Sequence, residues 1–440
     1  MKICIIGTGY VGLVSGVCFS DLGFYTTCID KDVEKINCLN SGVSTIYEPG
    51  LSSLIQVNRE KGRLKFTSNS KLAIIQADVL FVAVGTPSGI NGKPDISYVY
   101  RVIEEIAPLL SSSSYKVIVI KSTVPVGTTR QLKQKIFSLR PEADFDIVSN
   151  PEFLREGSAI KDFMIPDRVI IGVESNRATE IMQELYKPIC SDKIPTVYTN
   201  FETAELTKYA SNAFLATKIA FINEIADICE QCGGDIQDVS KGMGLDQRIG
   251  TNFLDAGPGY GGSCFPKDTL ALIDTACNYN TQTKIVKAAV SANTKRKKDM
   301  AYKIIKLCNG SVKDKLIAVL GITFKANTDD VRDSPSLDII AVLQNAGAQI
   351  QLYDPQGMKH AHKLLKNVSY KSSPYKTVKG ANALVILTEW KEFRELDLKR
   401  IKSLLKEPKI ADLRNIYPIQ KISEHEFEYI SIGRPSISRT

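Results

Sequence analysis

Three glycines near the N-terminus constrain the fold more than any other feature of this sequence. An apolar run, residues 2–7, leads directly into a GxGxxG pattern. The first glycine permits a tight turn, the second lets the backbone approach a pyrophosphate, and the third lets the next helix pack against the strand. This order predicts a dinucleotide whose phosphates lie at a helix N-terminus. The residues expected to bind it are Gly7, Gly9, Tyr10, Val11 and Gly12.

A carboxylate ends the second apolar run. Residues 24–30 resemble a buried strand, and Asp30 is its last residue, 18 residues after Gly12. A carboxylate at this place accepts hydrogen bonds from both ribose hydroxyls and repels a 2′-phosphate. We therefore expect NAD rather than NADP, with Lys35 as a further cofactor-binding residue.

The strand pattern recurs along the chain. Apolar runs separated by helix-length segments lie at residues 79–84, 117–120, 147–148 and 169–173, and the alternation restarts at residues 316–320, 349–353, 384–387 and 410–411. Strands that are apolar on both faces are typical of parallel sheets covered by helices on both sides. We predict an α/β protein with two Rossmann-like, doubly wound domains.

A long helix is predicted between the two sheets. Residues 201–232 contain neither Gly nor Pro, and their apolar residues recur at spacings of three and four. More helical sequence follows at residues 270–307. We therefore predict an NAD-binding domain over residues 1–200, a small central helical domain over 201–310 and a C-terminal α/β domain over 315–440. The last twenty residues are expected to form a mobile tail.

Composition narrows the classes of protein. Hydrophobic residues make up 43% and charged residues 24% of the 440 residues, as in globular proteins, and no apolar segment is long enough to span a bilayer. The net charge of +8 is modest, and the compact basic run at residues 295–298 suits a solvated helix face. Ten scattered cysteines favour free thiols over a disulfide framework. We therefore expect a cytoplasmic protein with no metal site and with neither nucleic acid nor membrane as a partner.

A lysine and an asparagine stand one turn apart on the predicted long helix. Lys208 and Asn212 are four residues apart, which places both on one face. Alone, such a pair would be an ordinary solvated face. A second region makes catalysis the better interpretation.

The loop at residues 260–268 combines three reactive groups. Cys264, Lys267 and Asp268 lie within five residues, after a glycine-rich approach that lets a substrate come close to the backbone. Lys267 can favour the thiolate form of Cys264, which is the nucleophilic form. The other cysteines lie mostly in apolar segments and are interpreted as core residues.

Several long motifs occur in a fixed order from residue 1 to about residue 420. They are YEPG at 47–50, VGTP at 84–87, STVPVGT at 122–128, NPEFLREG at 150–157, ELTKYASN at 205–212, GGSCFPKD at 261–268, GITFK at 321–325 and DDVRDSP at 329–335. In these motifs the chain resembles the nucleotide-sugar 6-dehydrogenases, the UDP-glucose/GDP-mannose dehydrogenase family. The segments at 47–50 and 265–268 resemble most the branch of the family that acts on UDP-glucose.

The resemblance assigns catalytic and cofactor roles by position. Cys264 would be the nucleophile, and Lys208, Asn212 and Asp268 would surround the reacting oxygen and a water molecule. Thr123 and Glu156 would lie beside the nicotinamide. Further contacts with NAD would come from Thr86, Lys267 and Arg332.

The resemblance also assigns the UDP-glucose site and the assembly. The substrate would be bound by Glu152, Phe153, Leu154, Arg155, Glu156, Lys208, Asn212, Phe253, Leu254, Asp255, Ala256, Gly257, Gly261 and Lys325. In the family the second α/β domain binds the UDP part. In the family the long helix also forms a dimer interface, and the resemblance therefore implies a homodimer.

The implied reaction takes a primary alcohol to a carboxylate and removes two hydrides. An aldehyde has no hydride to give until a nucleophile adds to its carbonyl. A Cys264 thiolate can add, and the thiohemiacetal oxyanion can be stabilised by Lys208 and Asn212. A second oxidation leaves a thioester, which water hydrolyses with the help of Asp268 or a glutamate of residues 152–156. Which carboxylate is the base in each step stays open.

Three other functions stay open as alternatives. A sister enzyme would oxidise GDP-mannose or a UDP-N-acetylhexosamine in the same way. A single-step hydroxyacid or phosphogluconate-type dehydrogenase would use a Lys and Asn pair, but it has no use for Cys264. A catalytically inactive dinucleotide sensor would be expected to carry damaged motifs, whereas these motifs are whole.

Overall fold

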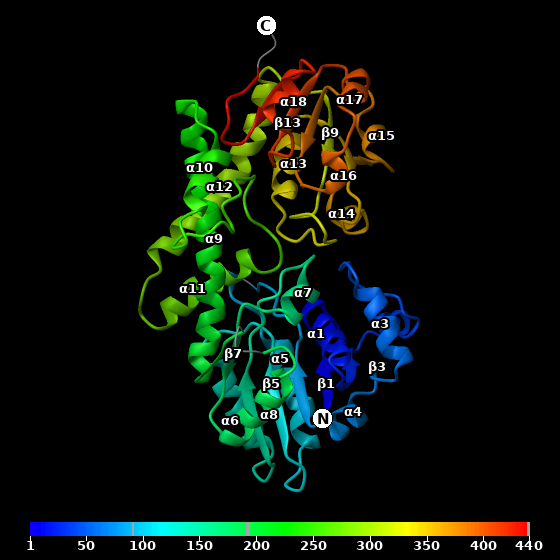
Figure 1. Ribbon diagram of the computed structural model, residues 1–440, viewed down its shortest axis with the longest axis vertical. Coiled ribbons are helices and arrows are strands. Elements are labelled where there is room, and N and C mark those ends of the chain that lie inside the picture. Colours follow the sequence, from blue (N-terminus) through cyan, green and yellow to red (C-terminus); the bar gives the residue numbers. More distant parts are fainter. Residues whose placement is uncertain (90–91, 191–193, 438–440) are drawn as a thin grey trace. The chain divides into compact units, whose positions relative to one another are not determined.

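The computed structural model describes residues 1–89, 92–190 and 194–437 of the chain, which fold into two compact units (Figure 1). The first unit comprises Met1–Ser211 and Asp274–Asn280, and the second comprises Asn212–Ile273 and Thr281–Thr440. Helices α9 (Phe201–Cys232) and α11 (Phe265–Asn278) contribute residues to both units. The three domain limits given above stay a prediction.

An eight-stranded sheet forms the centre of the first unit, in the order β3-β2-β1-β4-β5-β6-β7-β8. Neighbouring strands pair in parallel except β6 and β7, which meet antiparallel at Ser149 and Gly172. The strand order reverses between β1 and β4, which is where open α/β sheets bind ligands. The strands are β1 (Lys2–Ile6), β2 (Tyr25–Ile29), β3 (Leu64–Thr67), β4 (Val79–Val82), β5 (Lys116–Ile120), β6 (Phe145–Ser149), β7 (Val169–Gly172) and β8 (Thr196–Thr199).

Helices cover both faces of this sheet. Ile3 and Ile5 of β1 belong to the core cluster that includes α1, α7 and α8, whereas the alternating Cys4 and Ile6 belong to the cluster that includes α5 and α6. This is the side-chain period of two in a strand, with both faces buried. The helices are α1 (Tyr10–Asp21), α2 (Val33–Asn40), α3 (Leu51–Glu60), α4 (Ser70–Gln76), α5 (Ser97–Ile106), the 3-10 helix η2 (Ala107–Leu109), α6 (Thr128–Leu139), α7 (Ala159–Met164) and α8 (Asn176–Tyr186).

A buried carboxylate joins the start of α9 (Phe201–Cys232) to α6. Glu205 accepts hydrogen bonds from the backbone N–H of Gly127 (2.6 Å) and from the N–H (2.8 Å) and hydroxyl (2.6 Å) of Thr129. These N–H groups belong to the first turn of α6, where a helix has no partners of its own for them. Burial raises the pKa of Glu205 to about 7, against the lowering effect of these hydrogen bonds.

The second unit contains a parallel six-stranded sheet in the order β11-β10-β9-β12-β13-β14. The predicted pair of doubly wound α/β sheets is thereby confirmed. The strands are β9 (Leu316–Leu320), β10 (Gln349–Tyr353), β11 (Val368–Tyr370), β12 (Ala383–Ile386), β13 (Lys409–Asp412) and β14 (Glu428–Ser431). The strand predictions missed β3, β8, β11 and β14, which are three or four residues long and flank the apolar centres of the sheets.

Helices of the second unit pack on this sheet through one apolar cluster. Ile222 of α9 and Ile304 of α12 belong to it, together with Ile317 and Val319 of β9. The predicted long helix matches α9, whereas the predicted helical stretch at 270–307 forms α11 and α12, separated by a turn in which Asn280 has a φ of +54°. The helices are α10 (Ile236–Gly244), α11 (Phe265–Asn278), α12 (Lys284–Leu307), α13 (Pro335–Asn345), α14 (Met358–Leu364), α15 (Pro374–Val378), α16 (Lys391–Arg394), α17 (Leu398–Leu404) and α18 (Ile419–Ser423).

The predicted mobile tail is wrong as far as residue 437. Strand β14 pairs with β13, and Ile437 forms a β-bridge with Tyr429. The side chain of Arg434 is buried and donates to the hydroxyl of Tyr429 (2.9 Å) and to the carbonyl of Tyr417 (3.2 Å). These bonds order the segment, and residues 438–440 lie outside the described part of the chain.

The ten cysteines are free thiols, and all of them lie in the described part of the chain. The expectation of no metal site did not take into account one CxxC pair, Cys229 and Cys232, which lies in the last turn of α9. Cys229 is buried and Cys232 is exposed. Within the described residues, no group of three or more His, Cys, Asp or Glu side chains could hold a metal ion, and no helix is long and apolar enough to cross a membrane.

Candidate active site

The glycine-rich loop after β1 has the geometry that a bound dinucleotide requires. Gly7 has a φ of +101°, and a Cβ on Gly12 would lie 1.9 Å from the carbonyl oxygen of Gly7. A Cβ on Gly9, by contrast, would have no atom within 4 Å. Gly9 is also the N-cap of α1, so no side chain caps the N-terminal end of this helix. The open space and the N–H groups at the start of α1 fit a pyrophosphate.

Asp30 lies beside this loop, directly after β2. Its Oδ2 atom accepts hydrogen bonds from the backbone N–H (2.9 Å) and the hydroxyl (2.7 Å) of Thr8 and lies 3.4 Å from Nζ of Lys35. Burial works to raise the pKa of Asp30, but these hydrogen bonds and the Lys35 charge outweigh it, and the pKa is lowered. The predicted cofactor residues Asp30 and Lys35 are therefore neighbours. The lowered pKa favours the ionised Asp30 carboxylate, which can only accept hydrogen bonds.

Glu48 is a site residue to which the sequence analysis gave no role. Its buried carboxylate accepts hydrogen bonds from the hydroxyl of Tyr10, from the N–H of Gly157 (2.7 Å) and from the N–H of Ala159 (2.8 Å). It thus ties the first residue of α1 to the segment that follows Glu156. The YEPG motif was the available signal, and it served only to place the chain within the family.

Two threonines connect the loops after β4 and β5. The hydroxyl of Thr86 donates to the carbonyl oxygen of Thr123 (2.9 Å), and Thr86 is buried while Thr123 is half-buried. Strands β4 and β5 are adjacent in the sheet, so their carboxyl ends bring the two loops together. The predicted cofactor residues Thr86 and Thr123 are therefore neighbours.

A buried ion pair joins the predicted substrate residues Glu152 and Lys208. Nζ of Lys208 lies 3.1 Å from Oε1 of Glu152, and both side chains are almost completely buried. Oε2 of Glu152 accepts from the N–H of Leu154 (2.5 Å), and the Lys208 ammonium lies over the ring of Phe153, 5.2 Å from its centroid. Lys208 is therefore not a solvated surface residue.

A second buried lysine stands near this pair. Lys121 donates to Oδ1 of Asn150 (3.1 Å) and to the hydroxyl of Tyr186 (3.3 Å). Burial lowers the pKa of Lys121 to about 8, with the Glu152 charge opposing the shift and the Lys208 charge adding to it. Lys121 was not singled out in the sequence, although it directly precedes the STVPVGT motif.

A cavity of about 300 Å³ opens beside these residues. Glu152, Phe153, Leu154 and Arg155 line it together with Lys121 and Arg168. Arg155 is exposed and forms an ion pair with Asp162 (2.6 Å). Glu156, the last predicted residue of this segment, is half-buried. Four of the five predicted residues of this segment therefore line one cavity of the first unit.

The reactive loop of the second unit ends where α11 begins. Cys264 directly precedes Phe265, the first residue of α11, and is half-buried, with its Sγ 3.6 Å from Oγ of Ser263. The N-terminal end of a helix favours negative charge, and reactive thiolates are found at such ends. The local structure therefore suits a nucleophilic thiolate.

Asp268 lies one turn into α11 and is completely buried. Oδ2 accepts from Nδ2 of Asn212 (2.6 Å), and Oδ1 accepts from Nζ of Lys267 (2.5 Å). The structure thus brings together three predicted residues of the second unit. Lys267 also forms an ion pair with Asp268 (2.5 Å), and its predicted effect on the Cys264 thiol stays a prediction.

The residues predicted to hold the nucleotide lie on two loops of the second unit. Phe253 has a φ of +64°, and its ring lies 5.9 Å from that of Phe265. Leu254, Gly257 and Gly261 are buried, Ala256 is half-buried and Asp255 is exposed. A left-handed φ at a bulky residue is uncommon and typical of functional loops.

The second of these loops follows β9. Lys325 is half-buried, with its ammonium 5.4 Å from the centroid of the Phe324 ring. Arg332 forms two hydrogen bonds to the Asp330 carboxylate (2.8 and 2.9 Å). The predicted site residues therefore form local groups within each unit, with Lys208 in the first unit and Asn212 in the second, one turn apart on α9.

Three family models match the chain. The UDP-glucose/GDP-mannose dehydrogenase family, NAD binding domain, matches residues 1–190. The central domain of the same family matches residues 202–295, and its UDP binding domain matches residues 318–419.

Individual proteins match over nearly the whole chain. A UDP-glucose 6-dehydrogenase of Rhizobium meliloti (strain 1021) is 52% identical, over 99% of this chain and 100% of that protein. The UDP-glucose 6-dehydrogenase TuaD of Bacillus subtilis (strain 168) is 46% identical, over 100% of this chain and 94% of that protein. The structure of a UDP-glucose dehydrogenase from Pyrobaculum islandicum is similar with a TM-score of 0.88 and 34% identity, covering 96% of this chain and 95% of that chain.

Proposed function

The chain belongs to the UDP-glucose/GDP-mannose dehydrogenase family, and from this premise we propose that it oxidises UDP-glucose to UDP-glucuronate with NAD. The observation that carries the proposal is the buried Asp268 carboxylate with its partners Asn212 and Lys267, one turn beyond a half-buried Cys264 at the start of α11. A single-step dehydrogenase would have no use for a thiol at this place.

The residues of the first unit fit NAD. The open space at Gly9 and the uncapped start of α1 suit its pyrophosphate, and Asp30 suits its adenosine ribose. When bound, NAD supplies the hydride acceptor for each of the two oxidations. We propose that Thr86, Thr123 and Glu156 line the nicotinamide side of this site and that Lys267 and Arg332 contribute further contacts.

The thiol provides what the aldehyde level of the reaction needs. The Cys264 thiolate adds to the carbonyl carbon of the aldehyde, which makes a thiohemiacetal whose oxygen carries the negative charge. Lys208 and Asn212 donate hydrogen bonds to that oxygen. After the second oxidation a thioester links the sugar to Cys264, and water cleaves it to the carboxylate and the free thiol.

Two carboxylates are available for the proton transfers. Glu152 holds Lys208 by a hydrogen bond, and Asp268 holds Asn212 and Lys267. We propose that Asp268 takes the proton of the water that cleaves the thioester, because it is anchored in the same helix that begins after Cys264. In the alcohol oxidation the hydride passes to NAD, Lys208 passes a proton to Glu152, and Lys208 takes the hydroxyl proton in its place.

We propose a homodimer that forms through α9. Phe214, Phe221 and Ile228 are 67%, 47% and 59% exposed and follow one another at intervals of seven residues on this helix. Residues at this spacing form a stripe along one side of a helix, and exposed apolar stripes of this kind mark interfaces. Ten free thiols suit a reducing compartment, so the proposed setting is the cytoplasm, where a UDP-uronate serves polysaccharide biosynthesis.

Counting NADH per sugar consumed tests the function. The purified protein is assayed with UDP-glucose, GDP-mannose, UDP-N-acetylglucosamine and UDP-N-acetylmannosamine. Two NADH per UDP-glucose, with the other sugars far slower, is the expected result. A stoichiometry of one, or a preference for another nucleotide sugar, would overturn the proposal.

A further inference from the structure

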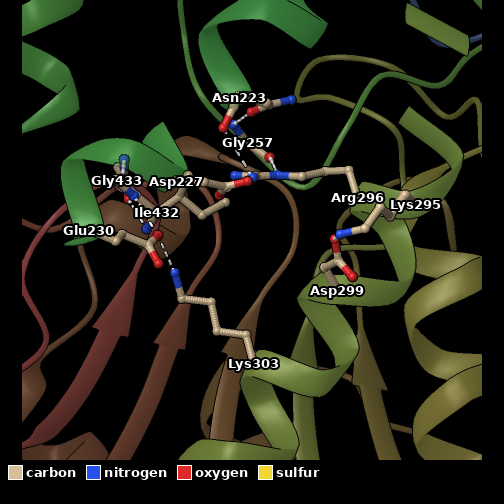
Figure 2. Close-up of polar contacts among 11 residues, drawn as sticks. Asn223, Asp227, Glu230, Gly257, Lys295, Arg296, Asp299, Lys303, Ile432 and Gly433 are labelled. Carbon is tan, nitrogen blue, oxygen red and sulfur yellow. Dashed lines mark hydrogen bonds and ion pairs between the residues drawn. The ribbon is translucent and has the colours of Figure 1, made fainter. Parts of the chain in front are cut away.

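The loop that leads to Cys264 is buried without belonging to a helix or strand. Gly257–Gly262 are buried, and each backbone N–H and C=O in such a place needs a hydrogen-bond partner. Several of these partners are side chains from α9 and α12 (Figure 2).

Asn223 and Arg296 bind the backbone N–H and the backbone carbonyl of one loop residue, Gly257. Oδ1 of Asn223 accepts from the N–H of Gly257 (2.8 Å), and Nε of Arg296 donates to the Gly257 carbonyl (3.2 Å). Nη1 of Arg296 donates to the backbone carbonyl of Asn223 (3.1 Å) and pairs with Asp227 (Figure 2). Arg296 is 4% exposed, so its guanidinium donates to the Gly257 carbonyl and to α9 rather than to solvent.

Asn293 holds a second residue of the loop in the same way. Its Oδ1 accepts from the N–H of Tyr260 (2.8 Å), and its Nδ2 donates to the Tyr260 carbonyl (3.1 Å). Gly259 has a φ of +121°, and a Cβ there would lie 2.7 Å from Oδ1 of Asn293. Asn293 therefore fixes the path of the chain as well as its hydrogen bonds.

The opposite side of the loop contacts the loops of the second sheet. The N–H of Gly262 donates to the carbonyl of Arg332 (2.9 Å), and a Cβ on Gly261 would lie 2.3 Å from the carbonyl oxygen of Asp333. The atom nearest to a Cβ on Gly257 would be Nη1 of Arg414, at 3.4 Å. The loop is thus held between the α9 and α12 side chains and the segment that carries Arg332.

We propose that Asn223, Asn293 and Arg296 are positioning residues that preorganise residues 257–260 for the nucleotide part of the substrate. This inference rests on the proposed function, since it is the family resemblance that assigns residues 253–257 to the nucleotide sugar. Without these side chains the loop must be ordered when the ligand binds, and the ordering cost lowers affinity. The reacting groups lie beyond this loop, with Cys264 directly before α11 and Asp268 in its first turn, so the effect falls on binding more than on turnover.

The first test compares Arg296→Met with wild type in KM for UDP-glucose, KM for NAD, kcat and the Kd of UDP measured by calorimetry. We expect KM for UDP-glucose and Kd for UDP to rise on the order of 10- to 100-fold, the size expected for losing hydrogen bonds from a charged donor. KM for NAD should change less than about twofold, because Arg296 holds the loop assigned to the nucleotide sugar and not the NAD site. Arg296→Lys retains a positive charge at this place and should restore part of the affinity for UDP.

Lys303→Met is the matched control. Lys303 is also a largely buried cation on α12, but it pairs with Glu230, which in turn accepts from the N–H of Gly433 (Figure 2). Neither group touches the loop, so this variant should lower Tm without a selective rise in the Kd of UDP. An equal rise in both variants would overturn the proposal, because general loosening would then explain it.

Asn293→Asp keeps the test decisive if Arg296→Met does not fold. The change retains the acceptor for the Tyr260 N–H and removes the donor to its carbonyl, which leaves two acceptors opposed. An unchanged Kd for UDP in a folded Asn293→Asp protein would overturn the proposal. UDP binding by a wild-type protein that does not oxidise UDP-glucose would defeat the proposed function while leaving the positioning role measurable.

Discussion

Asp30 and Asp354 occupy the same place in the two sheets. Each follows the strand beside the first strand of its sheet, and each accepts hydrogen bonds from the loop after that first strand. Oδ2 of Asp30 accepts from the N–H and hydroxyl of Thr8. Oδ2 of Asp354 accepts from the N–H (3.2 Å) and hydroxyl (3.1 Å) of Thr323 and from the N–H of Ile322 (2.8 Å).

The surroundings of the two carboxylates differ. Asp354 is 1% exposed and also accepts from the indole N–H of Trp390 (3.1 Å) and from the N–H groups of Gln356 (2.9 Å) and Gly357 (2.7 Å). The side chain of Asp30 is 17% exposed, with Lys35 3.4 Å away. The Asp354 carboxylate already accepts hydrogen bonds from several groups of the protein, so its role is structural. The partly exposed Asp30 carboxylate can accept further hydrogen bonds from the hydroxyls of a ribose.

The starts of the helices differ in the same direction. Gly9 leaves the start of α1 without a side-chain cap, whereas Ser334 caps α13 by accepting from the N–H of Ser336 (3.3 Å). Pro335 at the first position of α13 also has no N–H to offer. Two sheets that share the order of six parallel strands therefore present different ligand chemistry, and the loop residues decide which sheet suits a dinucleotide.

The largest effect is expected for Asp354→Ala. The change orphans several buried donors and should lower the free energy of unfolding by about 3 kcal/mol or more. Trp390 is the single tryptophan of the chain and donates to Asp354, so its fluorescence in a urea titration follows the unfolding of the second sheet. A loss below about 1 kcal/mol, on the same scale, would show that Asp354 is not the structural counterpart of Asp30.

Asp30→Ala should change the cofactor preference instead. We expect kcat/KM for NAD to fall on the order of 10- to 100-fold, with the preference over NADP relaxed and Tm nearly unchanged, because hydrogen bonds to the ribose are lost. Asp32→Ala is the control, since Asp32 caps α2 by accepting from the Lys35 N–H (3.0 Å). Comparable kcat/KM for NAD and NADP in the wild-type protein would contradict the role given to Asp30.

A smaller effect is expected for Glu48→Gln. The amide group would oppose one of the N–H groups of Gly157 and Ala159, which frees the start of α1 from the segment after Glu156. KM for NAD should rise on the order of 10-fold. Tyr10→Phe removes only one of the hydrogen bonds and should give a weaker rise; the reverse order would speak against Glu48 as the anchor.

The smallest effect concerns pH and the first unit alone. The pKa of Glu205 is raised to about 7 from 4.5, so the folded state holds a proton there that the unfolded chain releases. Its contribution to stability is therefore present below pH 4.5 and declines as the pH rises through about 7. The free energy of unfolding, followed by far-UV circular dichroism from pH 4.5 to 7.5, should decline less in Glu205→Gln than in wild type. If the free energy of unfolding declined equally with pH in both proteins, the titration of Glu205 would not contribute to the pH dependence of stability.

The sequence predicted those features that depend on local pattern. The strand before Gly7, the turn glycines and the ends of α9 follow from apolar periodicity and from the conformations that glycine allows. Cys264 and Asp268 could be found because unlike reactive groups crowd one short loop.

The missed features depend on partners far away in the sequence. Asn223 and Arg296 are polar residues of helices, and only the folded chain shows that they face Gly257 rather than solvent. The order of the C-terminal segment was missed as well, because only the folded chain shows that Arg434 is buried against Tyr417 and Tyr429. The ion pair between Lys267 and Asp268 likewise depends on side-chain geometry within α11.

The rate at which Cys264→Ser releases NADH from UDP-glucose is the sharpest test of a thiohemiacetal and a thioester on Cys264. Steady-state NADH production is expected to fall by at least about 10²-fold, because a hydroxyl adds poorly to the aldehyde and a serine ester hydrolyses more slowly than a thioester. UDP and NAD should still bind, and Cys277→Ser, which changes an exposed thiol, should behave as wild type. Release of two NADH per sugar at close to the wild-type rate in Cys264→Ser would contradict the account.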